Sequence, residues 1–190
     1  MVRQNVARRA ALVDAAIEVL AREGARGLTF RAVDAQAEVP IGTASNYFAS
    51  RDELFTQAGG RIYERLQPDA ATIADSLTGP RDRDRVTELM REVVERVSSF
   101  RSGYLALLEL RLEATRRPDL RAVLTEHIRG DVDANIRHHL ESGMPGDATA
   151  VVLLYLAMNW LVVERLTLPD VFGEEEVHRL VASAVERLVP

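Results

Sequence analysis

The chemistry that this sequence offers most clearly is hydrogen bonding from a short polar segment, IGTASNYF at 41–48. At helical spacing Val39, Ala44 and Phe48 can face inward, which leaves the polar side chains on the outer surface. The side-chain amide of Asn46 can both donate to and accept from adenine in the major groove of DNA. The segment therefore favours base reading, with Asn46 as the first candidate.

The neighbours of Asn46 suit other contacts to a duplex. Ile41 and the methyl group of Thr43 offer apolar contact to a thymine methyl. The hydroxyls of Thr43, Ser45 and Tyr47 suit phosphate oxygens. Gly42 lets the backbone approach a DNA strand closely, and the alternative is a glycine that only starts a helix. The segment contains no arginine.

A helix directly before this segment must hold it in place. Phe30, Val33 and Ala37 recur at helical spacing, and the hydroxyl of Thr29 can cap the first amides of that helix. Pro40 disfavours helical geometry in the residue before it and suits the first turn of a new helix. Two short helices separated by a turn are the pattern of a helix-turn-helix.

Arginines on either side of the motif are expected to contact phosphate. Arg3, Arg8 and Arg9 give the start of the chain a net positive charge. Arg51 follows Ser50 in SRDE, a capping-box spacing that starts another helix, where exposed amides also favour an anion. The complete set of expected DNA-contacting residues is Arg9, Thr29, Arg31, Ile41, Gly42, Thr43, Ser45, Asn46, Tyr47 and Arg51.

The first quarter of the chain resembles the tetracycline-repressor (TetR) family of regulators. The resemblance rests on Gly27, Thr29, AEV at 37–39, GT at 42–43, YF at 47–48 and SRDELF from Ser50. It implies a homodimer whose two motifs meet successive major grooves of a palindromic operator, with an effector pocket in the later helices. It also implies that the last two helices, 147–166 and 174–188, pair with their copies. Glu38 stands where a turn glycine is common in the family, and Ser45 where a tyrosine is frequent.

Composition limits the other classes of function. The 190 residues include no cysteine, which excludes disulfides, thiolate metal sites and a thiol nucleophile. The net charge is −5, but residues 1–60 hold seven arginines and seven acids, so the acidic excess lies outside the motif. The chain starts without an apolar signal sequence, and the longest apolar run, 151–158, is too short to span a bilayer. We expect a cytoplasmic protein without a membrane partner.

Helical periodicity continues along the chain and predicts an all-α fold of about nine helices. The first helix, 6–23, should end at Gly24. A break is expected at 68–82, where proline, glycine and short polar residues gather. The other expected helices are one that starts at the capping box of Ser50 and runs to about 67, and those at 84–100, 104–116, 118–142, 151–163 and 174–188. The expected domains are 1–48 for DNA binding, 49–67 as a connecting helix and 68–190 for effector binding and dimerisation.

Gly59 and Gly60 lie inside the connecting helix, where each costs about 0.8–1 kcal/mol relative to alanine. Close packing against a neighbouring helix would offset that cost. The sharper alternative is a hinge between the DNA-binding end and the rest of the chain.

Polar and aromatic side chains among apolar neighbours are the candidate contacts to a small-molecule effector. These candidates are Tyr104, Arg111, His127, Tyr155, Asn159 and Trp160. The alternative for each is an ordinary core residue whose polar group is satisfied by its neighbours. A pocket of this lining would suit a hydrophobic or amphipathic small molecule.

An enzyme is the competing class, and the motifs argue against it. The four histidines do not form a metal-binding helix motif, and the chain has neither a phosphate loop nor a serine elbow. No catalytic residue, metal site or cofactor is therefore expected. The remaining alternative to a ligand-released repressor is a helical protein-interaction adaptor with a degenerate helix-turn-helix and no effector.

Overall fold

The computed structural model describes residues 5–190, which form ten α-helices and no strand. The all-helical prediction is confirmed. The helices pack into two units, each with its own core. One unit joins the chain up to Gln67 with Arg101–His127, and the other joins Pro68–Phe100 with Ile128–Pro190. The first unit thus includes residues 101–127, which the sequence analysis assigned to the effector domain.

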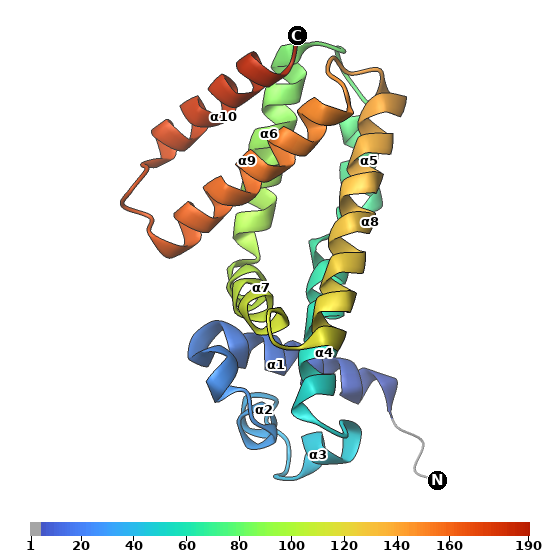
Figure 1. Cartoon of the computed structure of the whole chain (residues 1–190), viewed down its shortest axis with the longest axis vertical. Coiled ribbons are helices and arrows are strands. Elements are labelled where there is room, and N and C mark those ends of the chain that lie inside the picture. Colours follow the sequence, from blue (N-terminus) through green and yellow to red (C-terminus); the bar gives the residue numbers. More distant parts are fainter. Residues whose placement is uncertain (1–4) are drawn as a thin grey trace. The chain divides into compact units, whose positions relative to one another are not determined.

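The first unit is built around α1 (Val6–Gly27), which packs against three other helices. Those partners are α2 (Phe30–Gln36), α4 (Arg51–Leu66) and α7 (Arg101–Ala114) (Figure 1). The short helix α3 (Thr43–Tyr47) packs on α2, and α8 (Pro118–Ser142) contributes its residues up to His127. Buried Val13, Ile17 and Leu20 form an apolar stripe on α1, as the periodicity predicts.

The regular part of α1 ends at Gly24, as predicted. Gly24 has φ 69° and ψ −177°, which is accessible to glycine but not to residues with a side chain, and a short helical piece follows to Gly27. The backbone of Ala25 is then held from two sides. Its amide donates to Glu109 Oε2 of α7 at 3.0 Å, and its carbonyl accepts from Arg51 Nη2 of α4 at 2.9 Å. These bonds fix the end of α1 to both neighbouring helices.

The glycine pair in α4 lies at a close contact between helices. A Cβ on Gly59 would come within 3.0 Å of Leu124 Cδ2 and 3.6 Å of Leu120 Cδ1. A Cβ on Gly60 would meet His127 Nε2 at 3.5 Å, an ordinary contact distance. The missing side chain at Gly59 therefore lets the start of α8 approach α4, which is the close-packing alternative of the sequence analysis.

The second unit packs three long helices side by side: α6 (Arg83–Ser99), α9 (Ala148–Thr167) and α10 (Glu174–Leu188) (Figure 1). In α9 and α10 a buried residue recurs every four positions, whereas the two buried residues of α6 lie eight positions apart. The buried residues are Val86, Val94, Ala150, Leu154, Met158, Val162, Leu166, Val177, Val181 and Val185. The remainder of α8, from Ile128, completes this unit.

The expected break at 68–82 is partly wrong, because it contains α5 (Ala70–Ser76). The carboxylate of Asp69 caps this helix by accepting from the amide of Thr72 at 2.8 Å. Ser76 Oγ lies 2.9 Å from His138 Nε2 of α8. No side chain of α5 is buried, so apolar periodicity could not reveal it.

Within residues 5–190, α9 is the one helix that is long and apolar enough to cross a bilayer by length and composition alone. At 20 residues it extends beyond the run 151–158 that the sequence analysis measured. Leu154, Met158 and Val162 are buried in the second unit, as expected for a helix that packs in a folded core. Other apolar residues of α9 stay outside: Leu156 is 57% exposed and Trp160 64% exposed.

Candidate nucleic-acid interface

A buried carboxylate sets the position of α3. Asp34 lies on the buried face of α2 with 1% of its surface exposed. Its Oδ2 accepts from the amide of Gly42 at 2.7 Å, and its Oδ1 accepts from the amide of Ala44 at 2.6 Å. A carboxylate at this place satisfies two amides at a helix start that have no partner within the helix. Asp34 therefore fixes the start of α3 against α2.

The turn between the two helices uses left-handed backbone twice. Gly42 has φ 92°, and a Cβ built on it would meet nothing within 4 Å. Glu38 has φ 53° and is the one residue other than glycine with positive φ in the described chain. This is the position where the family pattern favours glycine, and the backbone geometry explains that preference. Gly42 is thus required by its backbone conformation, with open space at its surface for another molecule.

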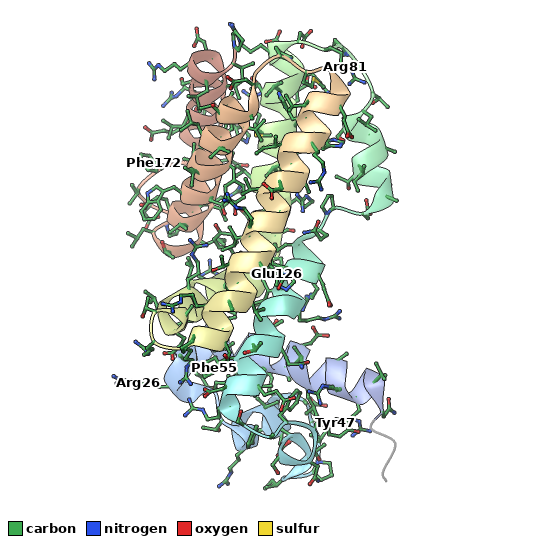
Figure 2. The ribbon with its side chains drawn as sticks, turned by 45° about the vertical axis from the view of Figure 1, so that its right-hand side comes forward. Arg26, Tyr47, Phe55, Arg81, Glu126 and Phe172 are labelled. Atoms are coloured by element: carbon green, nitrogen blue, oxygen red, sulfur yellow. The ribbon has the colours of Figure 1, made fainter. Side chains whose placement is uncertain are left out.

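The expected inner and outer faces of the segment are confirmed at four positions, whereas Val39, which was expected to face inward, is half-buried. Ala44 and Phe48 are buried, whereas Ser45 and Asn46 are exposed. Ile41 is 80% exposed, which is unusual for a large apolar side chain in a folded unit. Thr43 and Tyr47 are half-buried, and Arg31 is exposed on α2. Figure 2 shows Tyr47 at this end of the first unit.

The hydroxyl groups expected to contact phosphate are engaged locally. Thr43 Oγ1 donates to the carbonyl of Pro40 at 2.6 Å, and Ser45 Oγ donates to the carbonyl of Gly42 at 2.9 Å. Each hydroxyl must therefore rotate before it can donate to a phosphate oxygen. Thr29 caps α2 by accepting from the amide of Ala32 at 3.1 Å, which leaves its hydroxyl hydrogen available.

Arg9 is half-buried and engaged within the unit, which corrects the expectation that it belongs to a free basic arm, whereas Arg51 stays exposed while it contacts the end of α1. Arg9 pairs with Glu53, donates to the carbonyl of Tyr47 at 2.5 Å and lies over the ring of Phe48 at 4.6 Å. Arg51 donates to Ala25 and lies 5.8 Å from the ring centre of Phe55. Arg9 thus has an acidic partner, whereas both contacts of Arg51 are to uncharged groups. Arg3, named with the same arm, lies outside the described residues.

Asp34 was not among the residues expected at this site, and Glu53 was expected only as half of a capping box. The signal for Asp34 was present, since it lies four residues after Phe30 and three before Ala37, on the apolar face of its helix. An acid on an inward face needs donors, and the nearby helix start provides them. Glu53 accepts from the amide of Ala49 at 2.7 Å while its own amide donates to Ser50 Oγ at 3.1 Å.

Three effector candidates lie in the first unit. Tyr104 is buried, whereas Arg111 and His127 are exposed. The ring of His127 stacks on Tyr63, with ring centres 5.4 Å apart and an angle of 2° between the planes. Arg111 is therefore not the buried polar group that its apolar neighbours in sequence suggested, because α7 keeps a solvent-exposed side at Leu112, which is 62% exposed.

The other three effector candidates lie on α9 in the second unit. Asn159 Nδ2 donates to the carbonyl of Tyr155 in the preceding turn at 2.8 Å, so its amide is satisfied within its own helix. Trp160 is 64% exposed, which excludes the alternative of an ordinary core residue for it. The six candidates are thus divided equally between the two units.

One group of side chains in the second unit has a spacing suitable for a metal ion. Ligand atoms of Glu95, Glu174 and His178 all lie within 4.8 Å of one another. Arg165, however, pairs with both carboxylate oxygens of Glu95, and this hydrogen-bonded pairing lowers the pKa of that carboxyl group. A metal ion would have to compete with a guanidinium group that already neutralises the best ligand.

Family models match most of the chain. Residues 12–58 match the model described as "Bacterial regulatory proteins, tetR family". Residues 81–190 match the model described as "Tetracyclin repressor-like, C-terminal domain". The first match contains the helix-turn-helix, and the second contains all of α6, α9 and α10.

Individual proteins agree with these models. The HTH-type transcriptional regulator BetI of Rhizobium meliloti (strain 1021) is 31% identical over 123 residues, which are 64% of this chain and 59% of that protein. The crystal structure of the multidrug binding protein EbrR complexed with ethidium is 28% identical, covers 96% of this chain and 99% of its own, and has a TM-score of 0.67. A TetR family member from Streptomyces coelicolor A3 is also 28% identical, covers 96% and 98%, and has a TM-score of 0.69.

Proposed function

Because the chain belongs to the TetR family of DNA-binding transcriptional regulators, we propose that it is a repressor released from a palindromic operator by a small hydrophobic or amphipathic ligand. The observation that carries the DNA-binding part is the outer face of α3. Its start is fixed by Asp34, Ser45 and Asn46 are exposed on it, and Ile41 is exposed in the turn directly before it.

The geometry of α3 suits insertion into the major groove. Asn46 presents a donor and an acceptor to adenine, and one such two-point contact gives about 1–3 kcal/mol of discrimination. Ile41 adds an apolar surface for a thymine methyl. Because Asp34 fixes the start of α3 before DNA arrives, little conformational entropy is lost when the helix binds.

The proposed homodimer through α9 and α10 is supported on its α9 side by exposed apolar residues. Leu153, Leu156 and Trp160 of α9 are exposed, and so is Leu168 directly after it. A contiguous apolar face of this kind is costly in water, and a second copy of the same face would cover it. A two-fold dimer places its two reading helices on half-sites one helical turn apart, about 34–36 Å.

A ligand can release the operator only through a difference in its affinity for the two states of the protein. EbrR is a multidrug binding protein, and its complex with ethidium supports a hydrophobic or amphipathic ligand for this chain. Tyr104, which is buried in the first unit, and Tyr155, which is half-buried in the second, each remain a separate candidate for such a contact. The proposed place of action is the cytoplasm, where the operator is found.

The test uses duplexes from the DNA directly upstream of the gene. Fluorescence anisotropy at several salt concentrations should find one duplex bound more tightly than a scrambled duplex of equal length, with affinity falling steeply as salt rises. Adding a panel of lipophilic cations and neutral aromatic compounds should release that duplex for at least one member. Binding to no duplex at low salt would leave the adaptor as the better function, and binding that no compound relieves would exclude the ligand-released repressor.

A further inference from the structure

A pocket of about 430 Å³ in the first unit is lined almost entirely by charged side chains. Its lining residues are Ala25, Arg26, Arg51, Glu113, Arg116 and Arg117. They come from the end of α1, the start of α4 and the turn between α7 and α8. Figure 2 shows Arg26 and Phe55 on one side of this unit and Tyr47 on the other.

Two of the four arginines form ion pairs with carboxylates of the same unit. Arg116 and Arg117 both pair with the buried carboxylate of Glu113, with Arg117 Nε 2.8 Å from its Oε2. Hydrogen bonds from Arg116, the largest effect, and from Arg117 lower the pKa of Glu113. Arg117 also pairs with Asp52 of α4. These contacts make a rigid wall of the pocket.

Among residues 5–190, the other two arginines have no carboxylate partner. Arg51 contacts a carbonyl and an aromatic ring, both of which are uncharged. Arg26 is exposed at the end of α1 and forms no ion pair or hydrogen bond within residues 5–190. Two positive charges that face one pocket without a counter-ion attract an anion.

The ring of Phe55 helps to orient the guanidinium groups. Arg117 lies over this buried ring at 4.6 Å and Arg51 lies 5.8 Å from its centre. Guanidinium groups held in this way lose less entropy when they form two-point bonds to an oxyanion. The acids near the four arginines are Glu113, Asp52 and Glu109, so the positive charges remain in excess.

We propose that this arginine pocket binds a phosphate-type oxyanion, with Arg26 and Arg51 as the charges that it neutralises. Arg116 and Arg117, held by Glu113, supply additional donors. The phosphate can belong to a free small molecule or to the DNA backbone. The DNA source rests on the proposed function, whereas binding of free phosphate does not.

The test begins without DNA, in a chloride buffer free of phosphate. Isothermal titration calorimetry with inorganic phosphate should show saturable binding of one ion to each chain of the full-length protein. Arg26→Gln should weaken this binding about tenfold, the effect of one lost charged hydrogen bond. Arg83→Gln, which removes an exposed arginine from the second unit, should leave the affinity unchanged. Far-UV circular dichroism checks that both variants remain folded.

The second arm measures duplex binding by the same variants. If the ligand is a backbone phosphate, Arg26→Gln should lower the slope of log affinity against log salt by about one, and inorganic phosphate should compete with the duplex. If the ligand is free phosphate, the slope should be the same in both variants. Absence of saturable phosphate binding together with unchanged DNA binding by Arg26→Gln would overturn the proposal. Equal loss of phosphate binding in Arg83→Gln would also overturn it.

Discussion

The carboxylate of Asp34, on the buried face of α2, accepts a 2.6 Å hydrogen bond from the amide of Ala44 in the first turn of α3. This bond joins the two helices of the motif through a side chain of one and the backbone of the other. A five-residue helix is too short to be stable alone in water, so its order depends on such contacts.

Replacing Asp34 with alanine should impair folding and DNA binding together. The amides of Gly42 and Ala44 lose their acceptor, which should lower the free energy of unfolding by about 1–3 kcal/mol. Urea unfolding and duplex anisotropy measure the two effects. Asp69→Ala removes a cap of the same chemistry from α5, and DNA binding should survive it. Equal effects of the two changes would argue against a specific role for Asp34.

Replacing Glu38 with glycine should stabilise the protein. The left-handed conformation costs a residue with a side chain about 1–2 kcal/mol, and glycine avoids this cost. The greater conformational entropy of glycine in the unfolded state offsets part of the gain. We expect a net gain of about 1 kcal/mol in thermal or urea unfolding. Glu38→Ala keeps the backbone strain and should give no gain in stability. A similar gain from alanine would show that the gain comes from loss of the glutamate side chain and not from relief of backbone strain.

Local patterns predicted much of the helix-turn-helix. Thr29 and Ser50 cap helices as their types and spacing indicate, and Ala44 and Phe48 lie inward. Contacts between residues distant in sequence were harder to predict from the sequence. The partners of Arg9 and Arg51 come from other helices, and no periodicity reveals whether a guanidinium group faces solvent or a neighbouring carbonyl. The exposure of Trp160 was unpredictable for a related reason, since an apolar helix suits a core and a subunit interface equally well.

Replacing Asn46 with alanine should reduce operator affinity by about 1–3 kcal/mol, roughly 5- to 150-fold, because one two-point base contact is lost. Binding to a scrambled duplex at the same salt concentration should change much less. Asn135→Ala, at an exposed position of α8, is the matched control. A parallel loss on both duplexes would assign Asn46 to backbone contact and leave another residue as the base reader.

Replacing Leu156 with arginine should convert the expected dimer to a monomer. The side chain is 57% exposed, so the fold should tolerate the charge, while an apolar interface should not. Light scattering after size-exclusion chromatography measures the mass. Leu140→Arg, at a leucine of α8 that is 53% exposed, should leave the dimer intact. A monomeric parent protein would remove the basis for this prediction.

The contribution of Glu113 to stability should depend on pH. Its pKa is lowered in the folded state, first by hydrogen bonds from Arg116, so its stabilisation is present above its ordinary pKa of 4.5. That stabilisation is lost as the pH falls through the lower pKa of the folded state. Glu113→Gln should therefore be less stable than the parent at pH 7, by about 1–3 kcal/mol. The difference should shrink at pH values below 4.5, and a constant difference would contradict the assignment.

The two-sided hold on Ala25 makes this residue a natural spectroscopic reporter. Its own N–H responds to Glu109 on α7, and its carbonyl shares a peptide plane with the N–H of Arg26 and responds to Arg51 on α4. In a protein labelled with ¹⁵N, the amide resonances of Ala25 and Arg26 would therefore report the displacement of α7 and of α4 separately.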